Sequence, residues 1–252
     1  MNEIQKQLNG IYLEYLNKLT SDGELRNKLE IDRISPPVLI NIDAPYAQYA
    51  EADIKILYIG KENNGWMSRK NQEEYGLNQN FTETEIFLNA LLKLYKKFNL
   101  GRKYRRAFYT FMDLLLEKFK INNRKPGILW SNLIRLDCVN KKNLSESDKL
   151  KEKVFELDEN NQILREEIAI LKPDIVVFVT GPNYDHFLKK SFPGLKMNQL
   201  RDFKPREISI LEHDSLPKTS LRIYHPGYHN RLGRDYKSKL TTLIHDFHFD
   251  AL

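Results

Sequence analysis

Four short apolar segments limit what this chain can fold into more than any other feature. They are IKILYIG (54–60), ILWSNLIRLDCV (128–139), IVVFVT (175–180) and LRIY (221–224). The first is a nearly continuous apolar run, which is typical of a strand buried on both faces of a parallel sheet. Helical patterns between the segments predict right-handed crossovers, and therefore an α/β fold with helices on both faces of the sheet.

The helices are predicted from apolar spacing and from breaker residues. The expected helices cover residues 3–20, a pair within about 82–120 that Gly101 separates, one long charged helix over about 149–171, and a C-terminal helix over 236–249. The helical pair is interpreted as an insertion between the first two strands. Residues 181–220 are expected to be rich in loops.

Length and composition favour one domain that covers residues 1–252. The chain has 41% hydrophobic residues and no break in composition that would mark a second domain. Its net charge of +6 is compatible with an anionic partner such as nucleic acid. Cys138 is the only cysteine, which excludes an intramolecular disulfide and a cysteine-ligated zinc or iron–sulfur site.

Targeting and membrane segments are not expected. The first residues, MNEIQKQLNG, contain an acid and lack the apolar stretch of a signal peptide. No apolar run approaches the roughly 20 residues that a membrane span needs. The sequence therefore predicts a soluble, cytoplasmic protein without a membrane partner, and leaves its oligomeric state open.

Familiar cofactor signatures are missing from the sequence. It contains no phosphate-binding G-x-x-x-x-G-K-[ST], no G-x-G-x-x-G and no G-x-S-x-G motif. His225 and His229 are separated by Pro226 and Gly227, which argue against the helix that would place both on one face. No metal and no cofactor are therefore expected.

Ligands of open α/β sheets bind beyond the carboxyl ends of the strands. This rule selects residues 60–66, the neighbourhood of Asn132, residues 180–183 and residues 225–231. Together these segments resemble the motifs of the uracil-DNA glycosylase superfamily. GKENNGW (60–66) resembles the first active-site motif, WSNLIRLDCV the second strand, KPDIVVFVTG the third strand and its turn, and IYHPGYHNR the closing motif, all in the family's order.

The resemblance implies a fold and an activity. The fold would be a three-layer α/β/α domain around a central, mainly parallel four-stranded sheet. The activity would be hydrolysis of the N-glycosidic bond of uracil or another damaged base in DNA, the first step of base-excision repair. Neither a cofactor nor an iron–sulfur cluster would take part.

The resemblance also implies roles for individual residues. Glu62 would position water or offset the developing sugar cation, and His225 would donate a hydrogen bond to the base as the bond breaks. Asn132 would hydrogen-bond the edge of the flipped base, since its amide both donates and accepts. Base binding is also assigned to Gly60 and to Trp66 as a stacking platform backed by Tyr75 and Phe81, and nucleic-acid contact to Thr180, Asn183, Tyr228 and Arg231.

Two alternatives remain open beside the glycosylase interpretation. Asn63-Asn64 occupies the place where the family's first motif usually has a proline, so a catalytically silent relative that binds nucleic acid or a nucleobase-containing ligand is one alternative. An enzyme acting on a small nucleoside or nucleotide is the other. The stretch RKYRRAFY (102–109) mixes basic and aromatic residues, but a helix with a solvated basic face is the favoured interpretation.

Overall fold

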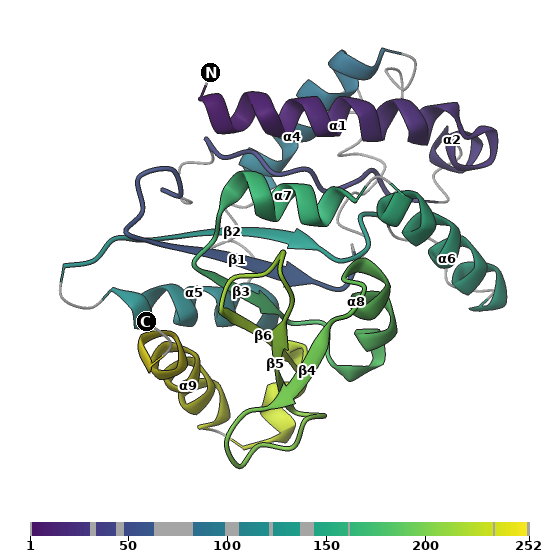
Figure 1. Ribbon diagram of the computed structural model, residues 1–252. Coiled ribbons are helices and arrows are strands. Elements are labelled where there is room, and N and C mark those ends of the chain that lie inside the picture. The colour runs from purple at the N-terminus through teal and green to yellow at the C-terminus, as the bar shows by residue number, and fades with distance from the viewer. Residues whose placement is uncertain are drawn as a thin grey trace. The chain divides into compact units, whose positions relative to one another are not determined.

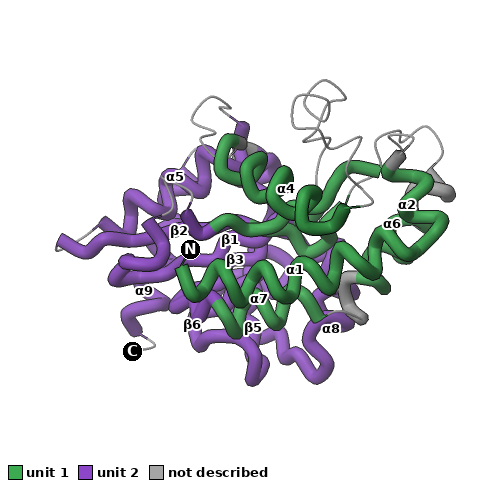
Figure 2. The backbone as a smooth tube through the Cα atoms, turned by 90° about the horizontal axis from the view of Figure 1, so that it is seen from above, with its two compact units in different colours: residues 1–41, 61–98, 131–170 green, residues 42–60, 99–130, 171–252 purple. Residues whose placement is uncertain are grey.

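The structure of the chain is a computed structural model of its 252 residues. It describes residues 2–30, 34–43, 48–62, 83–98, 106–120, 123–136, 144–160, 162–233 and 235–250. These residues form two compact units, each assembled from separate stretches of the chain (Figure 2). Unit 1 comprises residues 1–41, 61–98 and 131–170, and unit 2 comprises residues 42–60, 99–130 and 171–252. The expectation of a single domain stays a prediction.

The sheet of unit 2 contains six strands among the described residues, in the order β2-β1-β3-β6-β5-β4 (Figure 1). They are β1 (Ile54–Gly60), β2 (Pro126–Asn132), β3 (Ile175–Phe178), β4 (Lys196–Gln199), β5 (Ile208–Glu212) and β6 (Thr219–Ile223). The last two residues of β2 belong to unit 1. Strands β1, β3 and β6 pair in parallel, whereas β6, β5 and β4 pair antiparallel, so the sheet is mixed.

The strands that carry the apolar segments are buried as expected. Strands β2, β3 and β6 are buried along their whole length, and β1 is buried except at Lys55. The prediction of four strands is wrong, because β4 and β5 add an antiparallel edge. Strand β4 reads KMNQ and is mostly exposed, so no apolar run marks it in the sequence.

Unit 2 also contains the helices α5 (Ala107–Phe119), α8 (Asp185–Ser191) and α9 (Tyr236–Asp250). Two short 3₁₀ helices, η2 (Pro182–Tyr184) and η3 (Pro226–Arg231), follow β3 and β6. Helices α5 and α9 lie side by side (Figure 1), and both contact η3. The C-terminal helix is thus confirmed, whereas α8 lies in the stretch that was expected to be loop-rich.

Unit 1 is mainly helical. It contains α1 (Glu3–Ser21), α2 (Gly23–Glu30), α4 (Thr84–Phe98), α6 (Leu144–Asn160) and nearly all of α7 (Ile163–Leu171). Helix α1 contacts α2, α4 and α6, and it ends at Ser21, one residue beyond the predicted range of 3–20. The single long helix expected over 149–171 is wrong, since α6 and α7 are separate elements and Gln162 between them has a φ of +50°.

A buried ion pair organises the interior of unit 1. The side chains of Arg135 and Glu167 are both fully buried and form a bidentate ion pair. The Tyr12 hydroxyl donates to Glu167 over 2.6 Å and accepts from the Ile40 N–H over 3.1 Å. Arg135 also donates to Ser131 Oγ over 2.6 Å. Burial and then the charge of Glu167 raise the pKa of Tyr12 well above its usual value, so its hydroxyl stays a donor.

Candidate functional site

Three parallel strands of unit 2 end at one edge of the sheet. Ile59 of β1 pairs with Phe178 of β3, and its carbonyl accepts from the Val179 N–H over 2.8 Å. The Gly181 N–H donates to the carbonyl of Ile223, the last residue of β6, over 2.9 Å. The structure therefore brings the predicted residues Gly60, Thr180 and His225 to adjacent strand ends, as the rule for open sheets requires.

Gly181 lets the chain turn at the end of β3. Its φ is +70°, a conformation that residues with a Cβ rarely adopt. A Cβ at this position would lie 3.7 Å from the Tyr224 ring and 3.8 Å from the His225 nitrogen, so the turn passes directly beside the end of β6. A glycine here thus keeps the β3 turn next to His225.

His225 is fixed by the loop that follows it. Its Nδ1 accepts a hydrogen bond from the Gly227 N–H over 3.2 Å, and its carbonyl accepts from the Tyr228 N–H over 2.8 Å. A Cβ on Gly227 would lie 3.2 Å from Nδ1, so glycine permits this close approach. Because Nδ1 is the acceptor, the neutral imidazole carries its proton on Nε2 and can donate there.

Aromatic side chains pack beside His225. The Phe108 ring lies 6.3 Å from the His225 ring, measured between centroids, and is tilted by only 26° from it. Phe108 also contacts Tyr58 and Trp130, at centroid distances of 4.7 and 5.9 Å. The Tyr58 hydroxyl donates to the Phe108 carbonyl over 3.2 Å, which holds the start of α5 against β1. Phe108 and His225 are both half-buried.

Sequence reasoning missed Phe108. It lies in the stretch RKYRRAFY, where basic and aromatic residues are mixed. This mixture could have indicated a binding surface, but the favoured interpretation of the stretch is a helix with a solvated basic face. Trp66, the expected stacking platform, lies outside the described residues, as do Tyr75 and Phe81 behind it. Among the described residues, Phe108 is the aromatic side chain that the structure places against His225.

The remaining predicted residues of unit 2 differ in exposure. Tyr228 is 51% exposed, stacks on Tyr224 at 6.1 Å and carries the Arg231 guanidinium over its ring at 4.9 Å. Asn183 is exposed on η2. Thr180 is only 1% exposed, and no hydrogen-bond partner for its hydroxyl occurs among the described residues. The Thr180 hydroxyl is thus buried, and its contact with a nucleic acid stays a prediction.

Glu62 and Asn132 belong to unit 1. They lie on adjoining segments, because the carbonyl of Lys61 accepts from the Ile134 N–H over 2.9 Å. Asn132 is 4% exposed, and it directly follows Ser131 of the buried network. The Glu62 carboxylate lies 3.5 Å from the Lys151 ammonium of α6, so its charge has a partner within the unit.

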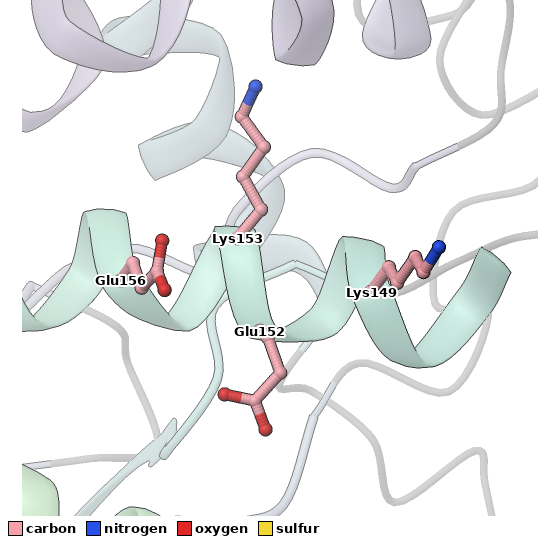
Figure 3. A pocket seen from close by; sticks show the side chains of 4 residues that line it. All are labelled: Lys149, Glu152, Lys153 and Glu156. Carbon is pink, nitrogen blue, oxygen red and sulfur yellow. The ribbon is translucent and has the colours of Figure 1, made fainter. Parts of the chain in front are cut away.

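A pocket of about 480 Å³ on α6 is unrelated to the predicted site residues. It is lined by Lys149, Glu152, Lys153 and Glu156, whose side chains leave the helix in different directions (Figure 3). Lys153 makes ion pairs with Asp22 over 3.1 Å and Glu24 over 2.7 Å. These alternating charges are typical of a solvated helix face, and they give no convergent set of ligands.

Burial of His229 predicts a dependence of stability on pH. Burial lowers the pKa of His229 from 6.5 to about 4, a fall that its hydrogen bond to the Tyr224 carbonyl opposes only in part. Between those pH values the unfolded chain binds a proton that the folded chain does not. The contribution of His229 is therefore complete above pH 6.5 and falls by about 1–3 kcal/mol as the pH approaches 4.

Urea denaturation of the wild type and of His229→Gln at several pH values between about 4 and 7 measures this contribution. The difference in unfolding free energy between the two proteins should shrink as the pH falls. His248, whose pKa burial also lowers, acts equally in both proteins and cancels. A difference that is independent of pH would contradict the prediction.

The comparisons with protein families and with curated proteins identify no relative of this chain. No protein-family model matches the chain, and no curated protein matches it significantly. Among the described residues, no group of three or more histidine, cysteine, aspartate and glutamate side chains could hold a metal ion. No described helix is both long and apolar enough to cross a membrane. The resemblance to the glycosylase superfamily therefore stays a prediction that rests on the four motifs.

Proposed function

We propose that the protein hydrolyses the N-glycosidic bond of uracil or another damaged base in DNA. The observation that carries this proposal is His225, which lies at the end of β6 with its Nδ1 occupied by the Gly227 N–H. In the neutral imidazole, this arrangement leaves the N–H donor on Nε2. It is a preorganised donor at the edge of the sheet where ligands bind.

The chemistry of the bond explains the need for such a donor. When the N-glycosidic bond breaks, negative charge develops on the departing base and positive charge on the sugar. A hydrogen bond from His225 Nε2 to a base oxygen stabilises the first of these charges. Water then adds to the sugar carbon from which the base departs. It supplies the hydroxyl group of the sugar and the proton of the released base.

Phe108 is proposed as the surface on which the base stacks. A base leaves the duplex at a cost of a few kcal/mol, and stacking on an aromatic side chain recovers about 1–3 kcal/mol. Phe108→Ala is therefore expected to weaken substrate binding by about that amount, seen as a higher KM for a uracil-containing oligonucleotide. Leu114→Ala, on an exposed position of the same helix, should leave KM unchanged. Equal KM values for both variants would contradict the role of Phe108.

The loop after β6 supports contact with a nucleic acid. Tyr228 offers an exposed aromatic face, and Arg231 places a cation on it. Aromatic faces bind bases and cations bind phosphates, so this pair suits a nucleic-acid strand. The chain's net charge of +6 acts in the same direction.

Asn132 and Glu62 keep the roles that the resemblance implies, namely reading the base edge and acting on the sugar cation or water. The burial of Asn132 supports a role in contacting a base rather than bulk solvent. The three-layer arrangement of the glycosylase fold belongs to the same proposal.

The ion pair of Glu62 favours a second candidate function. Lys151 lies 3.5 Å from the Glu62 carboxylate and offsets the charge that would stabilise a sugar cation. A protein that binds a nucleic acid or a base-containing ligand without cleaving it would still need His225 and Phe108 to contact the base. It would not need the negative charge of Glu62, because no sugar cation forms. Salt-dependent DNA binding without abasic product would identify this case.

The deciding experiment incubates the purified protein with single- and double-stranded oligonucleotides that contain one uracil, followed by alkali to cut abasic sites. We expect strand cleavage at the uracil and none in the same oligonucleotide with thymine. Hypoxanthine and xanthine substrates extend the assay to other deaminated bases. If no substrate is cleaved, the glycosylase proposal fails. A thermal-shift screen with free bases and nucleosides then tests for a small ligand.

A further inference from the structure

His229 is completely buried, although the sequence offers no reason for it beyond its place in the closing motif. Its Nε2 lies 2.9 Å from the carbonyl oxygen of Tyr224, the residue directly before His225. A carbonyl can only accept, so Nε2 carries a proton and donates it. The side chain of His229 thus binds the backbone carbonyl of the residue five positions earlier, directly before His225.

The surroundings of His229 anchor the loop. The His229 ring forms a T-shaped pair with Phe111 of α5 at a centroid distance of 4.9 Å, and the ring of Tyr236 of α9 lies at 5.3 Å. Helix η3 is a short 3₁₀ element with little stability of its own. His229 therefore ties this element to two longer helices and to the residue before His225.

The electrostatics keep His229 neutral. Its Nδ1 has no hydrogen-bond partner among the described residues, so a second proton there would be buried and unsatisfied. Burial lowers the pKa of His229 to about 4, and the nearby Lys237 acts in the same direction. Burial and then Glu207 raise the pKa of the neighbouring Tyr236 to about 12, so neither ring carries a charge near neutral pH.

We infer that His229 is a positioning residue for His225: by clamping the Tyr224 carbonyl and fixing η3, it holds the His225 ring where the Gly227 N–H can bind Nδ1. The clamp sets which nitrogen of His225 carries the proton. Its importance for catalysis rests on the proposed function of His225, whereas its effect on the ring itself does not.

Three variants separate the clamp from mere packing. His229→Phe fills the space with a ring but removes the N–H donor. If the phenylalanine prevents folding, His229→Met removes the donor and fills the space with a flexible apolar side chain. His229→Gln keeps an N–H group that can reach the Tyr224 carbonyl. His186→Gln alters an exposed histidine of α8 and serves as the control.

The first measurement is the tautomer of His225 at neutral pH, from side-chain nitrogen NMR spectra. The chain has six histidines, so the His225 signals can be assigned by their loss in His225→Gln. We expect the wild type, His186→Gln and His229→Gln to show the proton on Nε2. His229→Phe or His229→Met should show signals averaged between the two tautomers. Unchanged His225 signals in a folded variant without the donor would overturn the inference.

The second measurement is kcat/KM on the uracil oligonucleotide. Loss of the donor should reduce it by about 10- to 100-fold, since small errors in placing a catalytic group are costly. His229→Gln should recover most of the loss. If the tautomer changes but even the wild type cleaves no substrate, the positioning role stands and the proposed glycosylase function fails. If the tautomer changes but the loss of the donor leaves kcat/KM unaffected, the positioning role in catalysis is refuted.

Discussion

Replacing Glu167 by alanine is expected to lower the free energy of unfolding by about 3–5 kcal/mol, the usual cost of leaving one partner of a buried ion pair alone. In this variant the fully buried Arg135 loses both of its hydrogen bonds to the Glu167 carboxylate. The Tyr12 hydroxyl also loses its acceptor, which lies at 2.6 Å in the wild type. Urea denaturation followed by circular dichroism measures the change. A loss of less than about 1 kcal/mol would mean that solvent reaches Arg135.

Two comparisons make this experiment specific. Glu166 is the adjacent residue of α7 but is exposed, so Glu166→Ala should change stability by no more than about 0.5 kcal/mol. The double variant Arg135→Met/Glu167→Leu removes both charges at once. It should be more stable than Glu167→Ala, because no uncompensated charge remains in the interior.

Replacing His225 by alanine is expected to raise the activation free energy of base release by about 2–4 kcal/mol. This increase corresponds to a roughly 30- to 1000-fold lower kcat/KM. The variant loses the N–H donor on Nε2 that would stabilise the departing base. Asn132→Ala should cause a loss of similar size, because under the proposed function it would remove both hydrogen bonds of the amide to the base edge. Oligonucleotide cleavage under single-turnover conditions measures both effects.

His213 provides a matched control for the His225 variant. Its Nδ1 accepts from the Ser215 N–H over 3.0 Å, two residues further along, just as His225 accepts from Gly227. Its Nε2 lies 3.1 Å from the Pro193 carbonyl oxygen, and it is not among the residues of the candidate site. His213→Ala should therefore leave kcat/KM unchanged. Full activity in both His225→Ala and Asn132→Ala would place the active site elsewhere in the protein.

The central strands could be predicted because burial on both faces leaves an apolar run in the sequence. The strand predicted at residues 54–60 has the same bounds as β1, and β3 and β6 lie within one or two residues of expectation. Strand β4 could not be found this way, since an edge strand exposes its side chains and KMNQ carries no apolar signal. The break between α6 and α7 was missed because neither glycine nor proline marks it.

The position of three candidate residues at strand ends could also be predicted, because the rule for ligands of open sheets selects the carboxyl ends of the strands. Gly60, Thr180 and His225 do lie at adjacent ends of β1, β3 and β6, and their roles in binding and catalysis stay predictions. Phe108 and His229 could not be predicted. Phe108 lies beside a residue that is distant from it in the sequence, and His229 acts through a loop that folds back on its own backbone. Neither contact leaves a periodic pattern or a motif in the sequence.

The ion pair of Arg135 and Glu167 has a consequence for the order in which the protein can form. Tyr12 and Glu167 are 155 residues apart, so α1 makes this contact only after α7 has been synthesised. A nascent chain that contains α1 and Arg135 but not yet α7 lacks the Glu167 carboxylate that pairs with Arg135. Unit 1 therefore completes late during synthesis, and truncations before α7 should yield chains that chaperones retain rather than stable fragments.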